Sequence, residues 1–192
     1  MVTVLLCCVG TALAAEGELS IPVHLRESGS YERIIVTTDK PIVLAELVGT
    51  ADLVVEAFPV AHRSFLHSDQ SHIYTDYAFT LTEILKNRRR PGLLKAGHSI
   101  LVRRESGTVT VHGLRATTVE NGFPPFTQNG RYLLFLKEAG DQNTYVVIGA
   151  GRGAFEAGDQ ITPMLSTQDT PQSASPRQAF FNEVKALLKF TE

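Results

Sequence analysis

Cysteine is nearly missing from this sequence: its 192 residues contain only Cys7 and Cys8. Both lie in one apolar run at the N-terminus, Val2 to Ala14, which ends in small residues as a secretory signal peptide does. We predict that residues 1–14 are a signal peptide. Cleavage after Ala14 would leave a chain without cysteine. That excludes a disulfide-stapled scaffold, a thiolate zinc site and a cysteine nucleophile.

The sequence also lacks the charge pattern and the motifs of several common protein classes. No run reaches the roughly 20 apolar residues that a transmembrane helix requires, and neither H-E-x-x-H nor G-x-S-x-G occurs. The net charge of −2 provides no overall basic field, and we interpret Arg88-Arg89-Arg90 as a solvated turn. We therefore expect a periplasmic or secreted protein with no nucleic-acid partner and no membrane span in the mature chain.

The composition of the chain is sufficient for one folded domain. Hydrophobic residues make up 43% of the chain and charged residues 20%, which is typical of a globular protein with a core of its own. The stretch 166–175 is polar and rich in turn-forming residues, as flexible linkers are. We assign residues 15–165 to one β-barrel domain, 166–175 to a linker and 176–190 to a C-terminal helix.

Strand patterns dominate the proposed domain. From Ile73 to Lys86 apolar and polar residues alternate, with Tyr77, Phe79 and Leu81 on one face, which predicts a long strand with one face in the core. Shorter runs predict further strands at residues 20–25, 34–38, 53–60, 99–104, 108–112, 131–137 and 144–148. We expect 99–104 and 108–112 to form a hairpin, and 61–71 to be a polar loop. The fold class predicted is mainly β, an antiparallel OB-like barrel.

Two helices are expected beside the strands. Pro41 to Val48 carries an apolar stripe and is followed by Gly49, which favours a short helix in the N-terminal half. Ser175-Pro176-Arg177-Gln178 has the pattern of a capping box, and an apolar stripe follows it at helical spacing. The resulting amphipathic helix, residues 176–190, can pack on the barrel or on a partner.

One cluster of polar side chains has the composition of a metal site. His62, His67, Asp69 and His72 lie close together in the sequence, and Asp76 follows them. Imidazole nitrogens and carboxylate oxygens are ligands for zinc and other divalent ions. Their spacing matches no metal-binding signature. The cluster is therefore also explained as an exposed polar loop between two strands, and both interpretations stay open.

Several segments in a fixed order carry a resemblance to a known family. They are LAELVGTADLVVEA (44–57), IYTDYAFTLTEILK (73–86), the strand 97–103, NGRYLLFLK (129–137) and TYVVIGAGRGAF (144–155). Their order resembles a family of exported bacterial proteins of unknown function. In that family a short helix, an I-Y-T strand ending E-V-L-K-G and a G-E-x-x-L-L-F-L strand recur. The resemblance brings no catalytic residues to this chain.

The layout of strands and helices also resembles the OB-type barrel of netrin-like and metalloprotease-inhibitor domains. The resemblance implies a fold and no activity, because those inhibitors bind metal through an N-terminal cysteine, which the mature chain would lack. The preferred hypothesis is an exported, non-enzymatic module without a cofactor that binds an unidentified protein or ligand. The alternative is a divalent-metal-binding protein, or a metal-dependent hydrolase, that uses the cluster between His62 and Asp76.

Overall fold

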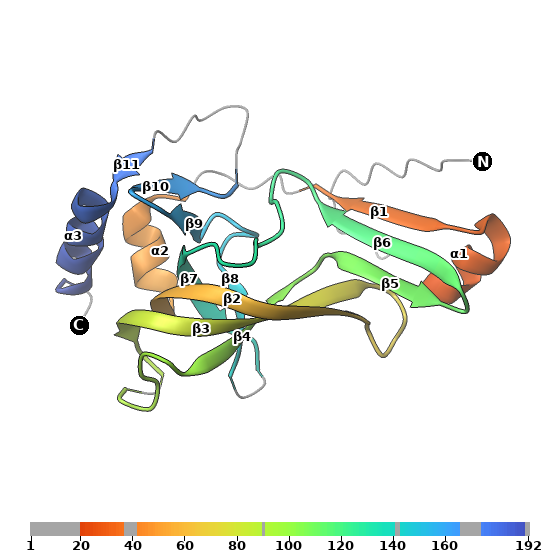
Figure 1. Cartoon of the computed structure of the whole chain (residues 1–192), viewed down its shortest axis with the longest axis horizontal. Helices are drawn as coiled ribbons and strands as arrows, with labels where there is room; N and C mark the ends of the chain where they lie inside the picture. The colour runs from red at the N-terminus through yellow and green to blue at the C-terminus, as the bar shows by residue number, and fades with distance from the viewer. Residues whose placement is uncertain (1–19, 37–41, 90, 141–142, 166–173, 191–192) are drawn as a thin grey trace. The chain divides into compact units, whose positions relative to one another are not determined.

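The computed structural model describes residues 20–36, 42–89, 91–140, 143–165 and 174–190, and these residues form a mainly β protein (Figure 1). The predicted signal peptide lies outside the described residues, as does most of the predicted linker. None of the helices in the described part is long and apolar enough to cross a membrane. The chain divides into two compact units.

The strands of the described residues are β1 (Tyr31–Ile35), β2 (Leu53–Leu66), β3 (Ile73–Asn87), β4 (Ser99–Arg104), β5 (Gly107–Val111), β6 (Leu114–Glu120), β7 (Tyr132–Glu138), β8 (Thr144–Val147), β9 (Ala154–Ala157), β10 (Gln160–Pro163) and β11 (Ser175–Pro176). The helices are α1 (Ile21–Ser28), α2 (Leu44–Thr50) and α3 (Arg177–Leu188). Strands β2 and β3 contribute residues to both units, because the unit boundaries fall within them.

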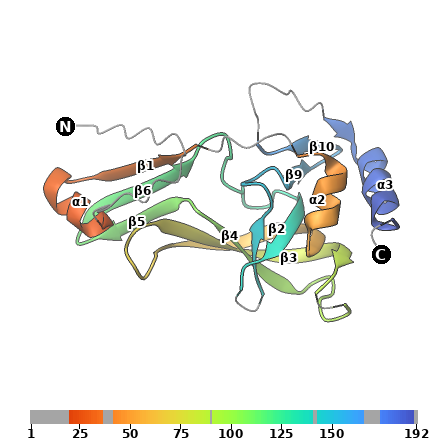
Figure 2. The same ribbon diagram turned by 180° about the vertical axis from the view of Figure 1, so that it is seen from behind.

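The smaller unit is built on a three-stranded sheet in the order β1-β6-β5 (Figures 1 and 2). Strand β6 lies in the middle, parallel to β1 and antiparallel to β5. Helix α1 places Ile21 and Leu25 in a small core with Ala116 of β6 and Ile73 of β3. This unit holds the β2–β3 connection and therefore three of the four predicted metal ligands.

Helix α1 replaces a predicted strand. We expected residues 20–25 to be extended, and this was wrong. Pro22 falls in the first turn of the helix, where its missing N–H costs nothing, and Gly29 ends the helix with a φ of 77°. Ile21 and Leu25 are one helical turn apart, so both reach the core.

The predicted hairpin between residues 99–104 and 108–112 was also wrong. Strand β4 belongs to the larger sheet, whereas β5 pairs with β6, a strand that was not predicted. The turn between β5 and β6 has His112 at a φ of 51° and Gly113 at 80°. Two positive φ angles in succession are typical of the type I′ turn that joins two-residue hairpins.

The larger unit contains an eight-stranded sheet in the order β11-β10-β9-β7-β2-β3-β4-β8, and β7 also pairs with β8. The succession β7, β2, β3, β4 and β8 therefore returns to β7. Pairing between β4 and β8 is parallel, whereas β7 is antiparallel to both β2 and β8. The sheet is thus mixed, and the prediction of an entirely antiparallel sheet was wrong in this respect.

The core of the larger unit confirms the main strand predictions. From Ile73 to Leu81 of β3, buried and half-buried residues alternate, and Tyr77, Phe79 and Leu81 all lie in one hydrophobic cluster. Phe79 and Tyr77 make edge-on ring contacts with Phe126. From Tyr132 to Leu136, β7 is buried at every position, as its continuous apolar run predicted.

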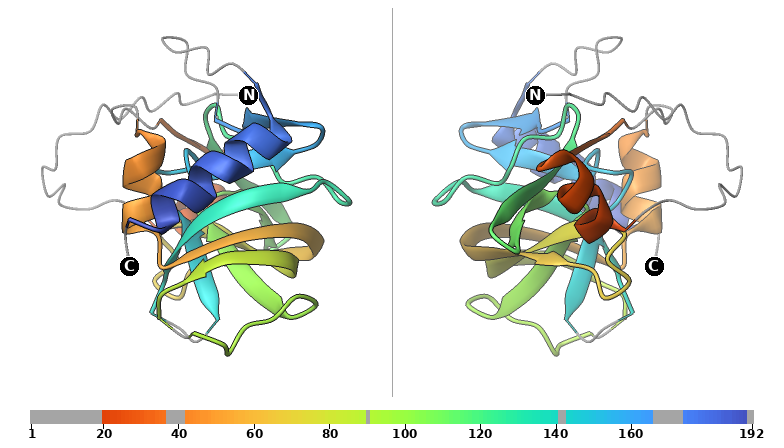
Figure 3. Two further views of the ribbon diagram at one scale, coloured as in Figure 1. Left: turned by 90° about the vertical axis from the view of Figure 1, so that its left-hand side faces the viewer. Right: turned by 90° about the vertical axis from the view of Figure 1, so that its right-hand side faces the viewer.

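A second cluster of the larger unit packs α2 and α3 side by side (Figure 3). Helix α2 spans Leu44–Thr50, two to three residues later than predicted. Phe181 and Val184 of α3 are buried, so this helix docks within its own chain. The predicted capping box is not formed, because Ser175 and Pro176 instead pair with β10 as β11.

Candidate metal centre

The β2–β3 connection is a tight hairpin rather than the long loop predicted for residues 61–71. Strand β2 continues to Leu66, and the His67 N–H donates to the His72 carbonyl at 2.9 Å. A turn closes the tip, with the Gln70 N–H donating to the His67 carbonyl at 2.8 Å. Leu66 joins the core of the smaller unit, which explains why pairing extends past the polar residues before it.

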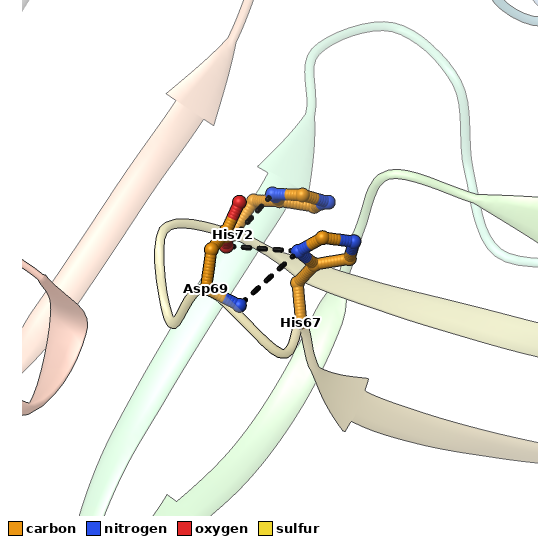
Figure 4. Close-up of side chains that lie close together, drawn as sticks. All are labelled: His67, Asp69 and His72. Carbon is orange, nitrogen blue, oxygen red and sulfur yellow. Dashed lines mark hydrogen bonds and ion pairs between the residues drawn. The ribbon is translucent and has the colours of Figure 1, made fainter.

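Three side chains converge at this tip (Figure 4). His67 Nδ1 lies 2.8 Å from Asp69 Oδ1, and His72 Nδ1 lies 3.9 Å from the same oxygen. One ligand atom from each residue falls within 4.8 Å of the others. The imidazole rings of His67 and His72 stack with their centroids 4.1 Å apart. Within the described residues, these three alone form a set of this kind.

The fourth predicted ligand, His62, is not part of this set. Its ring stacks on Tyr77 with a centroid distance of 5.3 Å. His62 lies within β2, whereas His67 follows the end of that strand at Leu66. Asp76, which the sequence placed near the cluster, is also outside the set.

Asp69 is held as a carboxylate by its neighbours. Ser71 donates to Asp69 Oδ1 twice, from its hydroxyl at 2.7 Å and from its backbone N–H at 2.9 Å. These bonds, with His67 beside the same oxygen, hold the pKa of Asp69 well below its ordinary range. The side chain is therefore ionised and ready to act as a ligand at any physiological pH.

The three side chains are open to solvent, and the ring of Tyr74 lies beside His67. Their exposed fractions are 40% for His67, 56% for Asp69 and 27% for His72. The Tyr74 ring makes an edge contact with the His67 ring, with centroids 6.3 Å apart, and stacks on the Phe65 ring, with centroids 5.4 Å apart. The ligand atoms are therefore within reach of an ion from solvent.

The distances suit a four-coordinate ion. Zinc binds imidazole nitrogen and carboxylate oxygen at about 2.0–2.2 Å in a tetrahedron, so neighbouring ligand atoms lie about 3.4 Å apart. The separations of 2.8 and 3.9 Å between Asp69 Oδ1 and the two Nδ1 atoms bracket that value. Small side-chain rotations would equalise them. Two nitrogens and one oxygen would then hold the ion and leave a fourth position for water or a ligand.

Glu105 is the residue near this site that sequence reasoning missed. Its Oε2 lies 4.0 Å from His72 Nε2, on the side of the ring away from Asp69. Glu105 lies more than thirty residues further along the chain, in the link from β4 to β5. No spacing pattern could have connected it with the hairpin, because the pairing of distant strands brings them together.

The basic run at residues 88–90 has a structural role at Arg89. Its Nε lies 3.1 Å from Oδ1 of Asp52, a buried carboxylate at the start of β2, while its own side chain is 61% exposed. The prediction of a solvated turn agrees with this exposure, and Arg90 lies outside the described residues.

Comparisons with protein-family models and with curated proteins gave no match for this chain. The geometry of the hairpin tip is therefore the main indication of function.

Proposed function

We propose that this protein is an exported, non-enzymatic module that binds one divalent transition-metal ion through His67, Asp69 and His72. The observation that carries the proposal is the convergence of both Nδ1 atoms on one carboxylate oxygen. It joins the two hypotheses drawn from the sequence, a binding module and a metal protein. His62, part of the predicted set, has no role in the proposed site.

The ligand atoms favour zinc, copper or nickel over calcium or magnesium. Calcium and magnesium take oxygen ligands, six or more for calcium, and bind imidazole poorly. Two imidazole nitrogens with one carboxylate suit the later first-row metals, for which affinity rises toward Cu²⁺. Zinc is the ion for which three protein ligands and one open position are most common. We therefore use zinc as the reference ion.

Exposure supports a binding role over the hydrolase alternative. Metal hydrolases commonly bind their substrate in a concave pocket that orients it beside the metal-bound water. Here Asp69 is 56% exposed and His67 is 40% exposed, at the end of a hairpin. An ion in this position can be reached by a side chain of another protein or by a small anionic ligand, which would fill its open coordination position.

For the fold of the larger unit we propose an OB-like barrel. Five strands, β7, β2, β3, β4 and β8, pair in succession and return to the first. OB folds are five-stranded barrels of this size, and their loops carry binding sites in many proteins. The resemblance of this chain to exported bacterial proteins supports a periplasmic or secreted location for it. Fractionation of cells that express the full chain tests this location.

Isothermal titration of the purified protein with zinc tests the proposed function. The wild type is expected to bind one ion per chain, and the His67→Ala, His72→Ala double variant to lose binding. His62→Ala is the matched control: it removes a histidine of the same hairpin that lies outside the site, and it should bind as the wild type does. Equal binding by the wild type and the double variant, or no binding by the wild type, would contradict the proposal.

A further inference from the structure

The two ring nitrogens of His72 face different partners. Nδ1 lies 2.9 Å from the Ser71 hydroxyl and 3.9 Å from Asp69 Oδ1, on the side of the proposed ion. Nε2 points the other way, toward Oε2 of Glu105 at 4.0 Å. A histidine that binds a metal through one nitrogen keeps a proton on the other, and that N–H needs an acceptor.

The backbone on both sides of Glu105 is fixed. Arg104 is buried and donates to Oε2 of Glu120 from Nε at 2.9 Å and from Nη2 at 2.6 Å. On the other side, the Thr75 hydroxyl of β3 donates to the carbonyl of Ser106. The link is thus hydrogen-bonded to β3, the strand that begins immediately after His72.

Gly107 allows this close approach. A Cβ at this position would collide with the hydroxyls of Thr75 and Ser64, and the residue has a φ of 148°. Only glycine fits both restrictions. The link therefore lies directly against β2 and β3, and its nearest carboxylate, Glu105, has a fixed starting point beside the His72 ring.

We propose that Glu105 is a positioning residue that accepts a hydrogen bond from His72 Nε2–H when a divalent ion occupies Nδ1. This inference rests on the proposed function of the site. The present distance of 4.0 Å is about 1 Å longer than such a bond, and the side chain of Glu105 is 59% exposed, so it is free to rotate. Carboxylates behind metal-binding histidines fix the tautomer and raise the basicity of the ligand nitrogen.

The charge balance of the site also supports this role for Glu105. Asp69 and Glu105 flank His72 on opposite sides, and together their two negative charges balance a divalent cation. A site with Asp69 alone would keep a net positive charge after binding. The bond would also join the hairpin tip to the link before β5, so that binding orders two segments distant in sequence.

Zinc titrations of Glu105→Gln, Glu105→Ala and the wild type test this inference. The wild type should bind most tightly and Glu105→Ala most weakly, with a loss of about 10–100-fold, the usual effect of removing such a carboxylate. Glu32→Gln, an exposed carboxylate on β1, makes the same change of net charge as Glu105→Gln and should bind as the wild type does. Melting of the metal-free variants should not change, which separates positioning from a purely structural role.

A second measurement follows the tautomer directly. In the zinc-bound wild type, nitrogen chemical shifts should show His72 protonated at Nε2 and metal-bound at Nδ1. If the wild type binds zinc and the Glu105 variants bind equally well, or if zinc sits on Nε2, the role of Glu105 is refuted while the proposed function stands. If the wild type binds no zinc, the double histidine variant behaves identically and both proposals fail together.

Discussion

The imidazole rings of His67 and His72 stack across the end of the β2–β3 hairpin, with centroids 4.1 Å apart and planes 22° from parallel. The hydrogen bond from the His67 N–H to the His72 carbonyl fixes the two residues as a cross-strand pair. Two protonated rings at this distance would repel each other. A single ion shared between their Nδ1 atoms removes that repulsion, and this relationship leads to the first prediction.

Acidification should weaken zinc binding in proportion to the number of imidazoles at the site. Metal binding to protonatable ligands releases protons, so the affinity for zinc falls as the pH falls. The plot of log affinity against pH should have a shallower slope for His67→Ala than for the wild type. Titration calorimetry at several pH values, in buffers with different ionisation enthalpies, measures the protons released. An equal slope for both proteins would show that His67 does not bind the ion.

Gly107→Ala should destabilise the protein more than Gly113→Ala does. Both glycines have positive φ, but a Cβ at Gly107 meets Thr75 and Ser64, whereas nothing lies within 4 Å of one at Gly113. We expect about 1 kcal/mol for Gly113→Ala from the backbone alone, and at least about 1–2 kcal/mol more for Gly107→Ala. Urea unfolding of both variants measures this. Equal losses would mean that the link before β5 is not packed against β2 and β3.

Asp52→Asn should lower stability at neutral pH and have less effect in acid. Burial alone would raise the pKa of Asp52, but the Glu138 N–H, the hydrogen bond and charge of Arg89, and the charge of Lys137 more than offset it and hold the pKa below its ordinary value of 3.8. A carboxyl with a lowered folded pKa stabilises the fold above its unfolded pKa and loses that contribution as the pH falls through the folded value.

The expected loss for Asp52→Asn at pH 7 is about 1–2 kcal/mol, at the low end of the range for hydrogen bonds to charged groups because Arg89 is 61% exposed. Unfolding curves between pH 2 and pH 7 should show the wild type and the variant converging below about pH 4. If the difference in free energy of unfolding between the wild type and the variant stays constant from pH 2 to pH 7, the charge of Asp52 contributes nothing to stability.

Arg177→Ala should release α3 from the sheet more strongly than Lys185→Ala does. Arg177 Nη2 lies 2.6 Å from Oε2 of Glu56, which is 3% exposed. Arg131 lies 3.3 Å from the other oxygen as an ion pair without hydrogen-bond alignment. Loss of Arg177 leaves a buried carboxylate with one poorly aligned partner, at a cost of about 2–4 kcal/mol.

Lys185 provides the matched comparison, because it lies on the same helix as Arg177. Its Nζ lies 2.9 Å from Oε1 of Glu83, and both of these side chains are exposed. Its removal should cost less than about 1 kcal/mol. Chemical denaturation compares the two variants. If Arg177→Ala and Lys185→Ala lower the free energy of unfolding equally, the buried pair does not anchor α3.

The sequence predicted elements where one local pattern dominates. Alternation from Ile73 to Lys86 and the continuous apolar run of β7 depend on burial alone, so both could be recognised. Prediction from the sequence failed where tertiary contacts determine the secondary structure. Residues 20–25 alternate weakly as a strand would, yet Ile21 and Leu25 gain more burial as one helical face. The partner of β5 was missed because a two-residue turn at His112-Gly113 was not recognised.

The candidate site was predicted in part for the same reason. Proximity in sequence grouped four residues, and the structure brings together His67, Asp69 and His72. His62 was included because a loop was expected where β2 continues, and its ring stacks on Tyr77 instead. Glu105 was beyond reach, since only the fold brings the link before β5 to the hairpin.

Anomalous X-ray diffraction from crystals grown with zinc tests the central claim most directly. The account predicts a zinc peak about 2.0–2.2 Å from His67 Nδ1, His72 Nδ1 and a carboxylate oxygen of Asp69. A zinc peak at His62 or elsewhere, with none at the hairpin tip, would contradict it.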